Sequence, residues 1–263
     1  MKKPARSPLP QLLVASLFAA ASAQAGFVTW SSPQTIFDHH DVSTAGTLVV
    51  ANNLGTFGNA SATVNGVTFT PFATSTISNT NTAGNVTLSA SSAIVGNNSD
   101  FGDELVAPFA TLTDDYKALL RSGSFAFAAT FPPPTISMEL KSLTPGAQYQ
   151  FQWWAHESEP SSFDPFAPPP PANPATTATS GVNSVTLERR GNLAGSVGQF
   201  ALGVFTATSA TQSITFNGSD AKTLLSAFQL RQLSTPAVPE PGTALFGLAL
   251  SGVALRSSSR RRR

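Results

Sequence analysis

Histidine, serine and acidic side chains are the groups that could do chemistry in this 263-residue chain, which has no cysteine. Its three histidines are His39, His40 and His156. No serine has a glycine both two residues before and two residues after it, so the nucleophile-elbow pattern is absent. A triad on another fold would have to use one of these histidines, and the lack of cysteine excludes thiolate zinc sites. We therefore expect no catalytic residues and no enzyme.

The densest group of possible metal ligands is Asp38-His39-His40-Asp41. Its carboxylates could hold Ca²⁺, and its imidazoles a transition metal. Adjacent side chains of an extended chain point apart, however, which disfavours joint chelation by the two histidines. We interpret the motif as a polar loop before the first strand, and we predict no metal site and no cofactor.

The most promising binding surface lies on a predicted strand, residues 148–155. One side of this strand carries three aromatic residues and is expected to face the core. The other side carries Trp154, with Gln150, Gln152 and His156 beside it. An exposed ring can stack on the apolar face of a sugar, while amides and an imidazole bond its hydroxyls. These four residues are our candidate glycan site; the competing interpretation is that this face packs beneath another strand or loop.

Paired carboxylates for glycoside hydrolysis need a defined separation across a cleft. Glu157 and Glu159 are close in sequence beside a proline-rich stretch, and nothing in the sequence marks them as buried. We interpret them as solvated loop acids. Asp100, Asp103 and Glu104 form a second acidic loop, which we also interpret as solvated surface.

Short runs rich in Val, Ile, Phe and Thr alternate with turn residues along most of the chain. They predict strands over 46–51, 62–70, 85–90, 124–130, 135–143, 148–155, 182–188, 199–207, 211–217 and 225–233. Only 114–121 has a helical pattern, with Asp114 as a possible N-cap. Many short strands and almost no helix predict an all-β fold, a β-sandwich or jelly roll.

Turn residues and prolines suggest how the strands connect. Asn65-Gly66 predicts a tight hairpin turn. Thr144-Pro145-Gly146 predicts a type II turn that joins the strands on either side of it as a hairpin. The many prolines within 159–180 preclude a central strand there, and we interpret this segment as an exposed polyproline-like loop.

The N-terminus has the layout of a secretory signal peptide. Lys2, Lys3 and Arg6 form a basic region, and residues 12–21 form an apolar one. Ala23 and Ala25 fit an A-x-A cleavage site. We predict a signal peptide over 1–25, removed after passage through the Sec translocon.

The C-terminus has the layout of a second targeting signal. Pro239, Glu240 and Pro241 precede an uncharged run, residues 243–255, that could form a helix of about 20 Å, short of the roughly 30 Å hydrocarbon core. Prolines keep the segment before this run extended. Arg256 and the cluster beginning at Arg260 close the chain, and basic residues there favour the cytoplasmic side.

This order of elements resembles the PEP-CTERM sorting signal of Gram-negative bacteria, here over 236–263. The resemblance implies a transient exosortase partner, which would process the chain near Pro239-Glu240-Pro241 and release it to the envelope or matrix. Until then a short C-terminal hydrophobic helix would hold the chain in the membrane. The competing interpretation is an ordinary tail anchor with a chance Pro-Glu-Pro.

The charge balance changes once both ends are set aside. The whole chain has a formal net charge of +1. Between Gly26 and Ala237 it holds seven basic and thirteen acidic side chains, a net charge of −6. Nucleic-acid binding needs a basic surface, so an acidic body argues against a nucleic-acid partner.

A second resemblance covers most of 41–233. It is carried by 41–50, 63–70, 143–153, 203–208, 211–216 and 227–231, which are similar to the strands of a domain found in exported bacterial proteins, including planctomycete-type ones. It implies a galactose-binding-like jelly roll over 26–235, a shape common among carbohydrate-binding modules. These segments are structural and identify no site residues.

Together these features predict an exported surface or extracellular-matrix protein of a Gram-negative bacterium. Its expected role is structural or adhesive, with possible weak binding of exopolysaccharide. The alternatives are a lectin or carbohydrate-active enzyme with a defined saccharide site, and a structural subunit that assembles through sheet edges.

Overall fold

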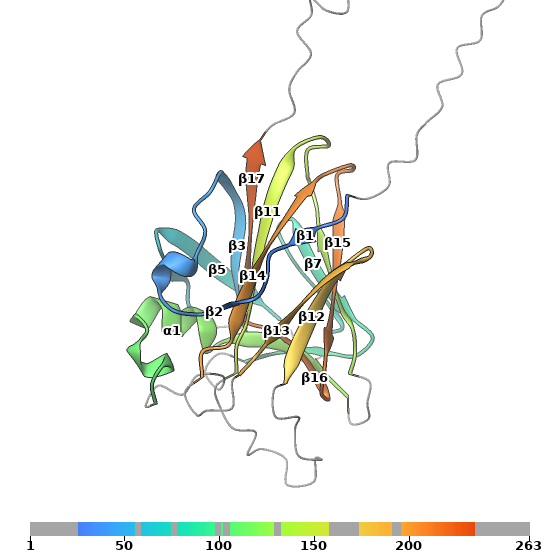
Figure 1. Ribbon diagram of the computed structural model, residues 1–263. Helices are drawn as coiled ribbons and strands as arrows, with labels where there is room; N and C mark the ends of the chain where they lie inside the picture. Colours follow the sequence, from blue (N-terminus) through green and yellow to red (C-terminus); the bar gives the residue numbers. More distant parts are fainter. Residues whose placement is uncertain are drawn as a thin grey trace, which may run out of the picture.

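The computed structural model describes residues 26–55, 59–74, 78–97, 101, 106–128, 133–157, 174–190 and 196–234. This part of the chain forms an all-β sandwich, as the sequence predicts (Figure 1). The predicted signal peptide, which includes Ala23 and Ala25, lies outside the described residues. The predicted sorting segment, with Pro239, Glu240, Pro241, Arg256 and Arg260, lies outside them as well. No helix within the described residues is long and apolar enough to span a bilayer.

One layer of the sandwich is an eight-stranded sheet. Its order is β1-β14-β11-β17-β3-β5-β4, and β2 pairs with β14 beside β1. All its pairs are antiparallel except β3 with β5. The strands are β1 (Thr29–Trp30), β2 (Gln34–Thr35), β3 (Thr47–Gly55), β4 (Ala62–Val64), β5 (Val67–Ala73), β11 (Gln148–Ala155), β14 (Gln199–Thr206) and β17 (Ala227–Ser234).

The other layer is a six-stranded antiparallel sheet in the order β13-β12-β15-β10-β7-β6. A three-stranded sheet, β16-β9-β8, contacts strands of both layers. The six strands are β6 (Thr80–Ala83), β7 (Val86–Ala90), β10 (Ile136–Leu140), β12 (Ala175–Ser180), β13 (Asn183–Glu188) and β15 (Gln212–Gly218). The smaller sheet comprises β8 (Ile94–Asn97), β9 (Gly123–Phe127) and β16 (Lys222–Leu225).

The main core lies between the two layers. Successive side chains of a strand point to opposite faces, so every second residue of β10 and β11 is apolar and buried here, as are Ile214 and Phe216 of β15. Trp153 of β11 meets Phe216 of β15 edge-to-face across the core, with ring centroids 5.1 Å apart. Burying each such ring stabilises the fold by roughly 1.5–3 kcal/mol.

A second apolar cluster lies on the outer face of the eight-stranded sheet. The helix α1 (Asp114–Leu120) contacts β4 and buries Tyr116, Leu119 and Leu120. Figure 1 shows α1 beside the β5 side of this sheet. The 3-10 turns η1 (His39–Asp41) and η2 (Phe109–Thr111) flank this layer. The outer face of β11 is therefore covered.

Two predictions about connections have different outcomes. The Asn65-Gly66 hairpin turn between β4 and β5 is confirmed, with positive φ at both residues. The hairpin expected around Pro145 is wrong, because β10 belongs to the six-stranded sheet and β11 to the eight-stranded one. The turn instead carries the chain from one layer to the other. Its Gly146 N–H donates to the carbonyl of Ala207, in the connection that follows β14.

The interpretation of 159–180 as one loop is wrong at its C-terminal end. Residues 175–180 form β12, which lies between β13 and β15 in the six-stranded sheet. The prolines end at Pro174, so the residues that follow can donate every ladder hydrogen bond. Residues 158–173 lie outside the described part of the chain.

Candidate functional site

The predicted glycan site on β11 is not an open surface. The ring of Trp154 is fully buried in the second apolar cluster, together with Tyr116 of α1 and Phe69 of β5. Its Nε1–H donates to the Tyr116 hydroxyl at 3.1 Å, and Phe69 meets the ring edge-to-face at 5.5 Å. A sugar cannot stack on a ring with no exposed face, so the prediction of Trp154 as a sugar platform is wrong and the competing interpretation holds.

The amides of the same face bind the chain's own backbone. Residues 41–46, here called the covering segment, run across β11 and β17. Gln152 Nε2 donates to the Asp41 carbonyl at 2.6 Å, and Gln152 Oε1 accepts from the Ser43 N–H at 2.9 Å. Gln150 Oε1 accepts a hydrogen bond from the Ser43 hydroxyl. The two glutamines thus hold the covering segment where a sugar was expected.

Arg231 of β17 extends this contact. Its guanidinium donates to the carbonyls of Ala45 (2.7 Å), Thr44 (3.1 Å) and Gly46 (3.0 Å). Desolvation lowers the pKa of Arg231, but an arginine keeps its proton in proteins. A buried cation satisfied by three backbone carbonyls fixes the loop that carries them.

His156, the fourth residue of the predicted site, is also fully buried. Its ring stacks on Phe109 of η2, with centroids 4.8 Å apart and planes within 10°. Burial lowers its pKa from 6.5 to about 4, opposed in part by the backbone of Val197 and by Glu157. The ring is therefore neutral at neutral pH and contributes packing rather than a surface ligand.

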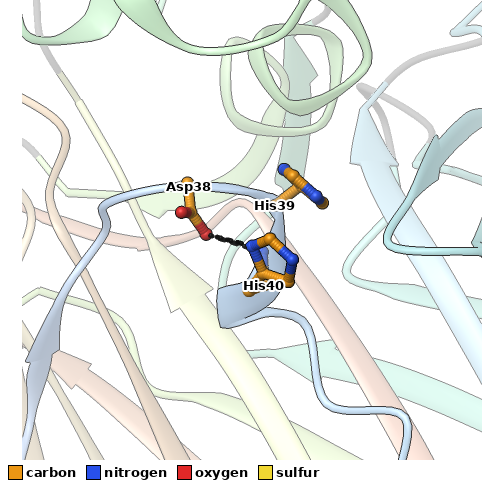
Figure 2. Close-up of side chains that lie close together, drawn as sticks. All are labelled: Asp38, His39 and His40. Carbon is orange, nitrogen blue, oxygen red and sulfur yellow. Dashed lines mark hydrogen bonds and ion pairs between the residues drawn. The ribbon is translucent and has the colours of Figure 1, made fainter.

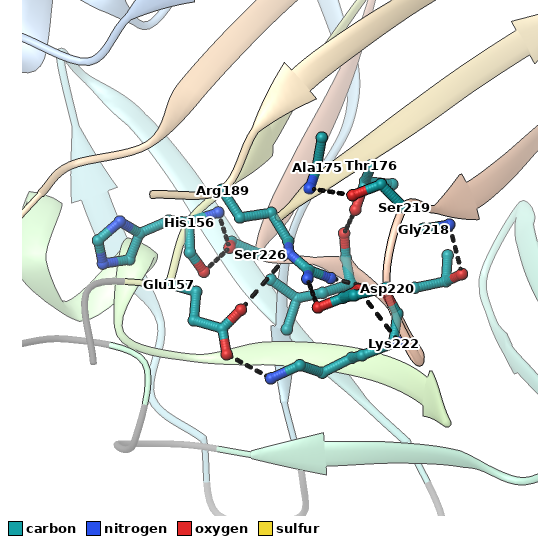
Figure 3. A network of polar contacts seen from close by, with 12 residues as sticks. His156, Glu157, Ala175, Thr176, Arg189, Gly218, Ser219, Asp220, Lys222 and Ser226 are labelled. Atoms are coloured by element: carbon teal, nitrogen blue, oxygen red, sulfur yellow. Dashed lines mark hydrogen bonds and ion pairs between the residues drawn. The ribbon is translucent and has the colours of Figure 1, made fainter. Parts of the chain in front are cut away.

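Glu157 was interpreted as a solvated loop acid, and this is wrong. Its carboxylate is only 8% exposed and pairs with Arg189 Nε at 3.4 Å and with Lys222 Nζ (Figure 3). Arg189 is fully buried and also pairs with Asp220. Burial acts to raise the pKa of Glu157, but the charges of Lys222 and Arg189 outweigh it and the net shift is downward. An ionised, paired carboxylate is a poor general acid.

This ionic cluster fixes both ends of the 158–173 segment. The Glu157 N–H donates to the Arg189 carbonyl at 2.8 Å, and the Arg189 N–H donates to the Pro174 carbonyl at 2.8 Å. Arg189 Nη1 also donates to the Lys222 carbonyl at 2.7 Å. Sequence analysis missed Arg189, Asp220 and Lys222 because their separation in the chain gives no local pattern.

The outer face of the six-stranded sheet is, by contrast, a surface of hydroxyl groups. The register aligns one row of cross-strand neighbours that are all serine or threonine. Strand spacings of about 4.8 Å give this row a length of roughly 24 Å. In order from β13 to β6, its members are Ser184, Thr179, Thr215, Ser137, Ser89 and Thr80.

Two shorter rows flank the first, and together the three rows are here called the hydroxyl face. One contains Thr186, Thr177 and Asn217, and the other contains Ser213, Glu139, Thr87 and Thr82. Facing threonines hydrogen-bond to each other, as in Thr177 with Thr186 at 2.8 Å. The one charged residue in these rows, Glu139, pairs with Lys141 at 3.2 Å. Apart from Glu139, these rows are polar and uncharged, and they contain no large apolar side chain.

The Asp38-His39-His40-Asp41 motif is a compact turn rather than an extended loop (Figure 2). The two imidazole rings lie 3.9 Å apart, so the expectation that adjacent histidines point apart is wrong. Asp38 is the N-cap of η1, and its Oδ1 accepts from the His40 N–H at 2.7 Å. The second acidic loop, around Asp103 and Glu104, lies outside the described residues.

No family model and no curated protein matches the sequence. Among solved structures, the chain is similar to the enzymatically active domain of tailspike protein 4 from bacteriophage CBA120, at 13% identity and a TM-score of 0.30. That match covers 56% of this chain and 19% of the tailspike chain. A structure of promiscuous carbohydrate-binding modules of the β-sandwich superfamily matches at 14% identity and a TM-score of 0.14, covering 77% and 99% of the two chains. Neither likeness is strong enough to assign a function.

Proposed function

We propose that this chain is an exported, non-enzymatic protein of the bacterial surface or extracellular matrix, which contacts neutral polysaccharide through its hydroxyl face. The observation that carries this proposal is the unbroken row of six hydroxyl side chains across six strands. Hydroxyls donate and accept hydrogen bonds, as sugar hydroxyls do. A nearly uncharged face also suits a neutral polymer better than an ionic one.

Binding of this kind is weak at each contact and depends on many contacts. Exchanging a water hydrogen bond for a protein one contributes only about 0.5–1.5 kcal/mol net. Roughly 24 Å of aligned hydroxyls can act together on a long chain, because further contacts follow at high effective concentration after the first. We therefore expect retention of polysaccharides and little affinity for short oligosaccharides.

Export and sorting belong to the same proposal. Gly26, the expected first residue of the mature protein, donates from its backbone nitrogen to Thr208 Oγ1 at 3.1 Å. A Cβ at this position would lie 2.2 Å from the Thr206 carbonyl oxygen, so glycine is the residue that fits. These contacts attach Gly26 to the connection that follows β14. The galactose-binding-like jelly roll and exosortase processing near Pro239-Glu240-Pro241 are further parts of the proposal.

Co-sedimentation of the purified exported protein with insoluble neutral polysaccharides tests the binding. The test variant is Thr179→Lys/Thr215→Lys, which places two cations on facing positions in the middle of the hydroxyl face. The matched control is Thr63→Lys/Thr68→Lys, a facing threonine pair on β4 and β5. We expect loss of retention in the test variant alone.

Other results would change the assignment. Equal loss in both variants would remove the hydroxyl face from the proposal. Saturable binding of a short oligosaccharide would favour a lectin, and hydrolysis of the polysaccharide would favour an enzyme. Mass spectrometry of the exported protein tests the sorting separately: a C-terminus beyond residue 255 would contradict exosortase processing.

A further inference from the structure

The η1 turn brings three metal-ligating side chains together on the surface of the sandwich. One ligand atom from each of Asp38, His39 and His40 lies within 4.8 Å of the others (Figure 2). The side chains of His40 and Asp38 are 72% and 43% exposed, which leaves room for water to complete a coordination shell. We propose that these three residues form a binding site for a divalent transition-metal ion of the Zn²⁺ class.

The spacing of two of the ligands already matches such an ion. Zn²⁺ binds imidazole nitrogen and carboxylate oxygen at about 2.0–2.1 Å in tetrahedral geometry, which places neighbouring ligand atoms about 3.3 Å apart. Asp38 Oδ1 and His40 Nδ1 are 3.2 Å apart. An ion can therefore enter between them with little movement of either side chain. The ring of His39 lies against that of His40, and its rotation would bring a third ligand nitrogen to the ion.

The backbone that carries the ligands is fixed before any ion arrives. Asp41 Oδ2 accepts from the N–H groups of Phe37 (2.6 Å) and Asp38 (3.1 Å), and the Tyr116 hydroxyl lies 3.4 Å from it. The Asp41 carbonyl is bound by Gln152. The Asp38 carboxylate in turn caps the turn through the His40 N–H. Such pre-organisation lowers the entropy lost when the ion binds.

The ligand chemistry selects the class of ion. Imidazole suits Zn²⁺, Cu²⁺ and Ni²⁺, whereas Ca²⁺ and Mg²⁺ require six or more oxygen ligands. The turn offers two imidazoles and the Asp38 carboxylate, whose Oδ1 also accepts from the His40 N–H. The Asp41 carboxylate lies outside this group and accepts from the N–H groups of Phe37 and Asp38. We therefore expect binding of Zn²⁺ and no competition from Ca²⁺.

Isothermal titration of the untagged exported protein with Zn²⁺ at neutral pH tests the site. We expect one ion per chain, and a loss of affinity of at least tenfold in both His39→Gln and His40→Gln. Asp38→Asn removes the charged ligand but keeps a good N-cap, so affinity should fall while the turn survives. Asp115→Asn, which removes an exposed carboxylate at the start of α1, is the control and should bind as the wild type does.

Nuclear magnetic resonance of the wild-type histidine rings gives a result that needs no variant. Zn²⁺ should shift the ring signals of His39 and His40 and leave those of buried His156 unchanged. Stoichiometric binding that survives both glutamine variants, equal affinity for Ca²⁺, or absence of Zn²⁺ binding at millimolar concentration would each overturn the proposal.

Discussion

The two outer faces of the sandwich are built in opposite ways. The eight-stranded sheet presents Trp154, Gln152 and Arg231 outward, and α1 and the covering segment bury all three. The six-stranded sheet presents serine and threonine outward, and the described part of the chain places no helix over them. A large apolar ring on an outward position is more stable when another element covers it, whereas a hydroxyl group can hydrogen-bond to water.

This difference changes where binding should be sought. Aromatic and amide groups are familiar sugar ligands, so the sequence predicts sugar binding at β11. In the folded chain those groups bind Tyr116, Asp41 and Ser43 instead. The outer face that α1 and the covering segment leave open is that of the six-stranded sheet, whose outward side chains are serine and threonine.

Opening the covered face should reduce stability more than any other substitution proposed for this chain. Trp154→Ala removes a fully buried ring and leaves a cavity beneath α1, so the free energy of unfolding should fall by about 3–5 kcal/mol. Urea denaturation followed by circular dichroism measures this change. Polysaccharide retention by the fraction that stays folded should be unaffected. A folded variant of wild-type stability that has lost retention would reinstate Trp154 as a sugar platform.

Two ion pairs, one buried and one exposed, should also differ in their contribution to stability. Arg189→Met leaves Asp220 and Glu157 without their buried guanidinium partner and should lower the free energy of unfolding by about 3 kcal/mol. Lys141→Met, the matched control, breaks the exposed pair with Glu139 and should change it by less than about 1 kcal/mol. Adding Asp220→Asn to Arg189→Met should restore part of the loss. Equal effects at the two sites would refute the burial argument.

The pH dependence of stability is expected to report the burial of His156. Its folded pKa of about 4 lies below the ordinary 6.5, so the unfolded chain takes up a proton first as the pH falls. The contribution of the neutral, buried His156 ring to stability is complete above pH 6.5 and is lost as the pH falls from 6.5 to about 4. Between pH 7 and pH 5 the free energy of unfolding should fall by about 2 kcal/mol.

His156→Gln should flatten this slope, and urea titrations at several pH values measure it. Staying above pH 5 keeps Glu157 ionised in both states, because its folded pKa is lowered from 4.5 and its contribution is lost only at more acidic pH. An unchanged slope in the variant would place the protonation elsewhere.

Strand positions could be predicted because alternation of apolar and polar residues is a local property of the sequence. The partner of a strand is not local. The turn at Pro145 correctly signals a change of direction, but long-range pairing of β11 with β14 and β17 decides which sheet the chain enters. The start of β12 after Pro174 was missed because nearby prolines dominated the interpretation of the whole segment.

The candidate sites were predictable only in their residue types. The sequence identifies Trp154 and Gln152 as chemically capable, but it cannot show that their partners are Tyr116 and Asp41, 38 and 111 residues away. The η1 turn depends on Asp38 as a cap, which an extended-chain assumption excluded. The hydroxyl face was implicit in alternating threonines, yet its continuous rows appear only once the strand order is known.

Two threonines on opposite faces of one strand should differ in stability by a smaller amount. Thr176 and Thr179 both belong to β12, but Thr176 points inward and its Oγ1 donates to the Leu224 carbonyl at 3.0 Å, whereas Thr179 belongs to the hydroxyl face. Thr176→Val keeps the shape and removes that buried hydrogen bond, so the free energy of unfolding should fall by about 1 kcal/mol. Thr179→Val should change it by less than about 0.5 kcal/mol, because water satisfies the outward hydroxyl.

Urea denaturation of the two valine variants, measured side by side, tests this difference. If Thr179→Val were as destabilising as Thr176→Val, the Thr179 hydroxyl would be part of the fold's own hydrogen bonding, as Gln152 is on the opposite face. It would then be unavailable to a polysaccharide. A neutral Thr179→Val that weakens retention would show instead that this hydroxyl is kept for contacts outside the chain.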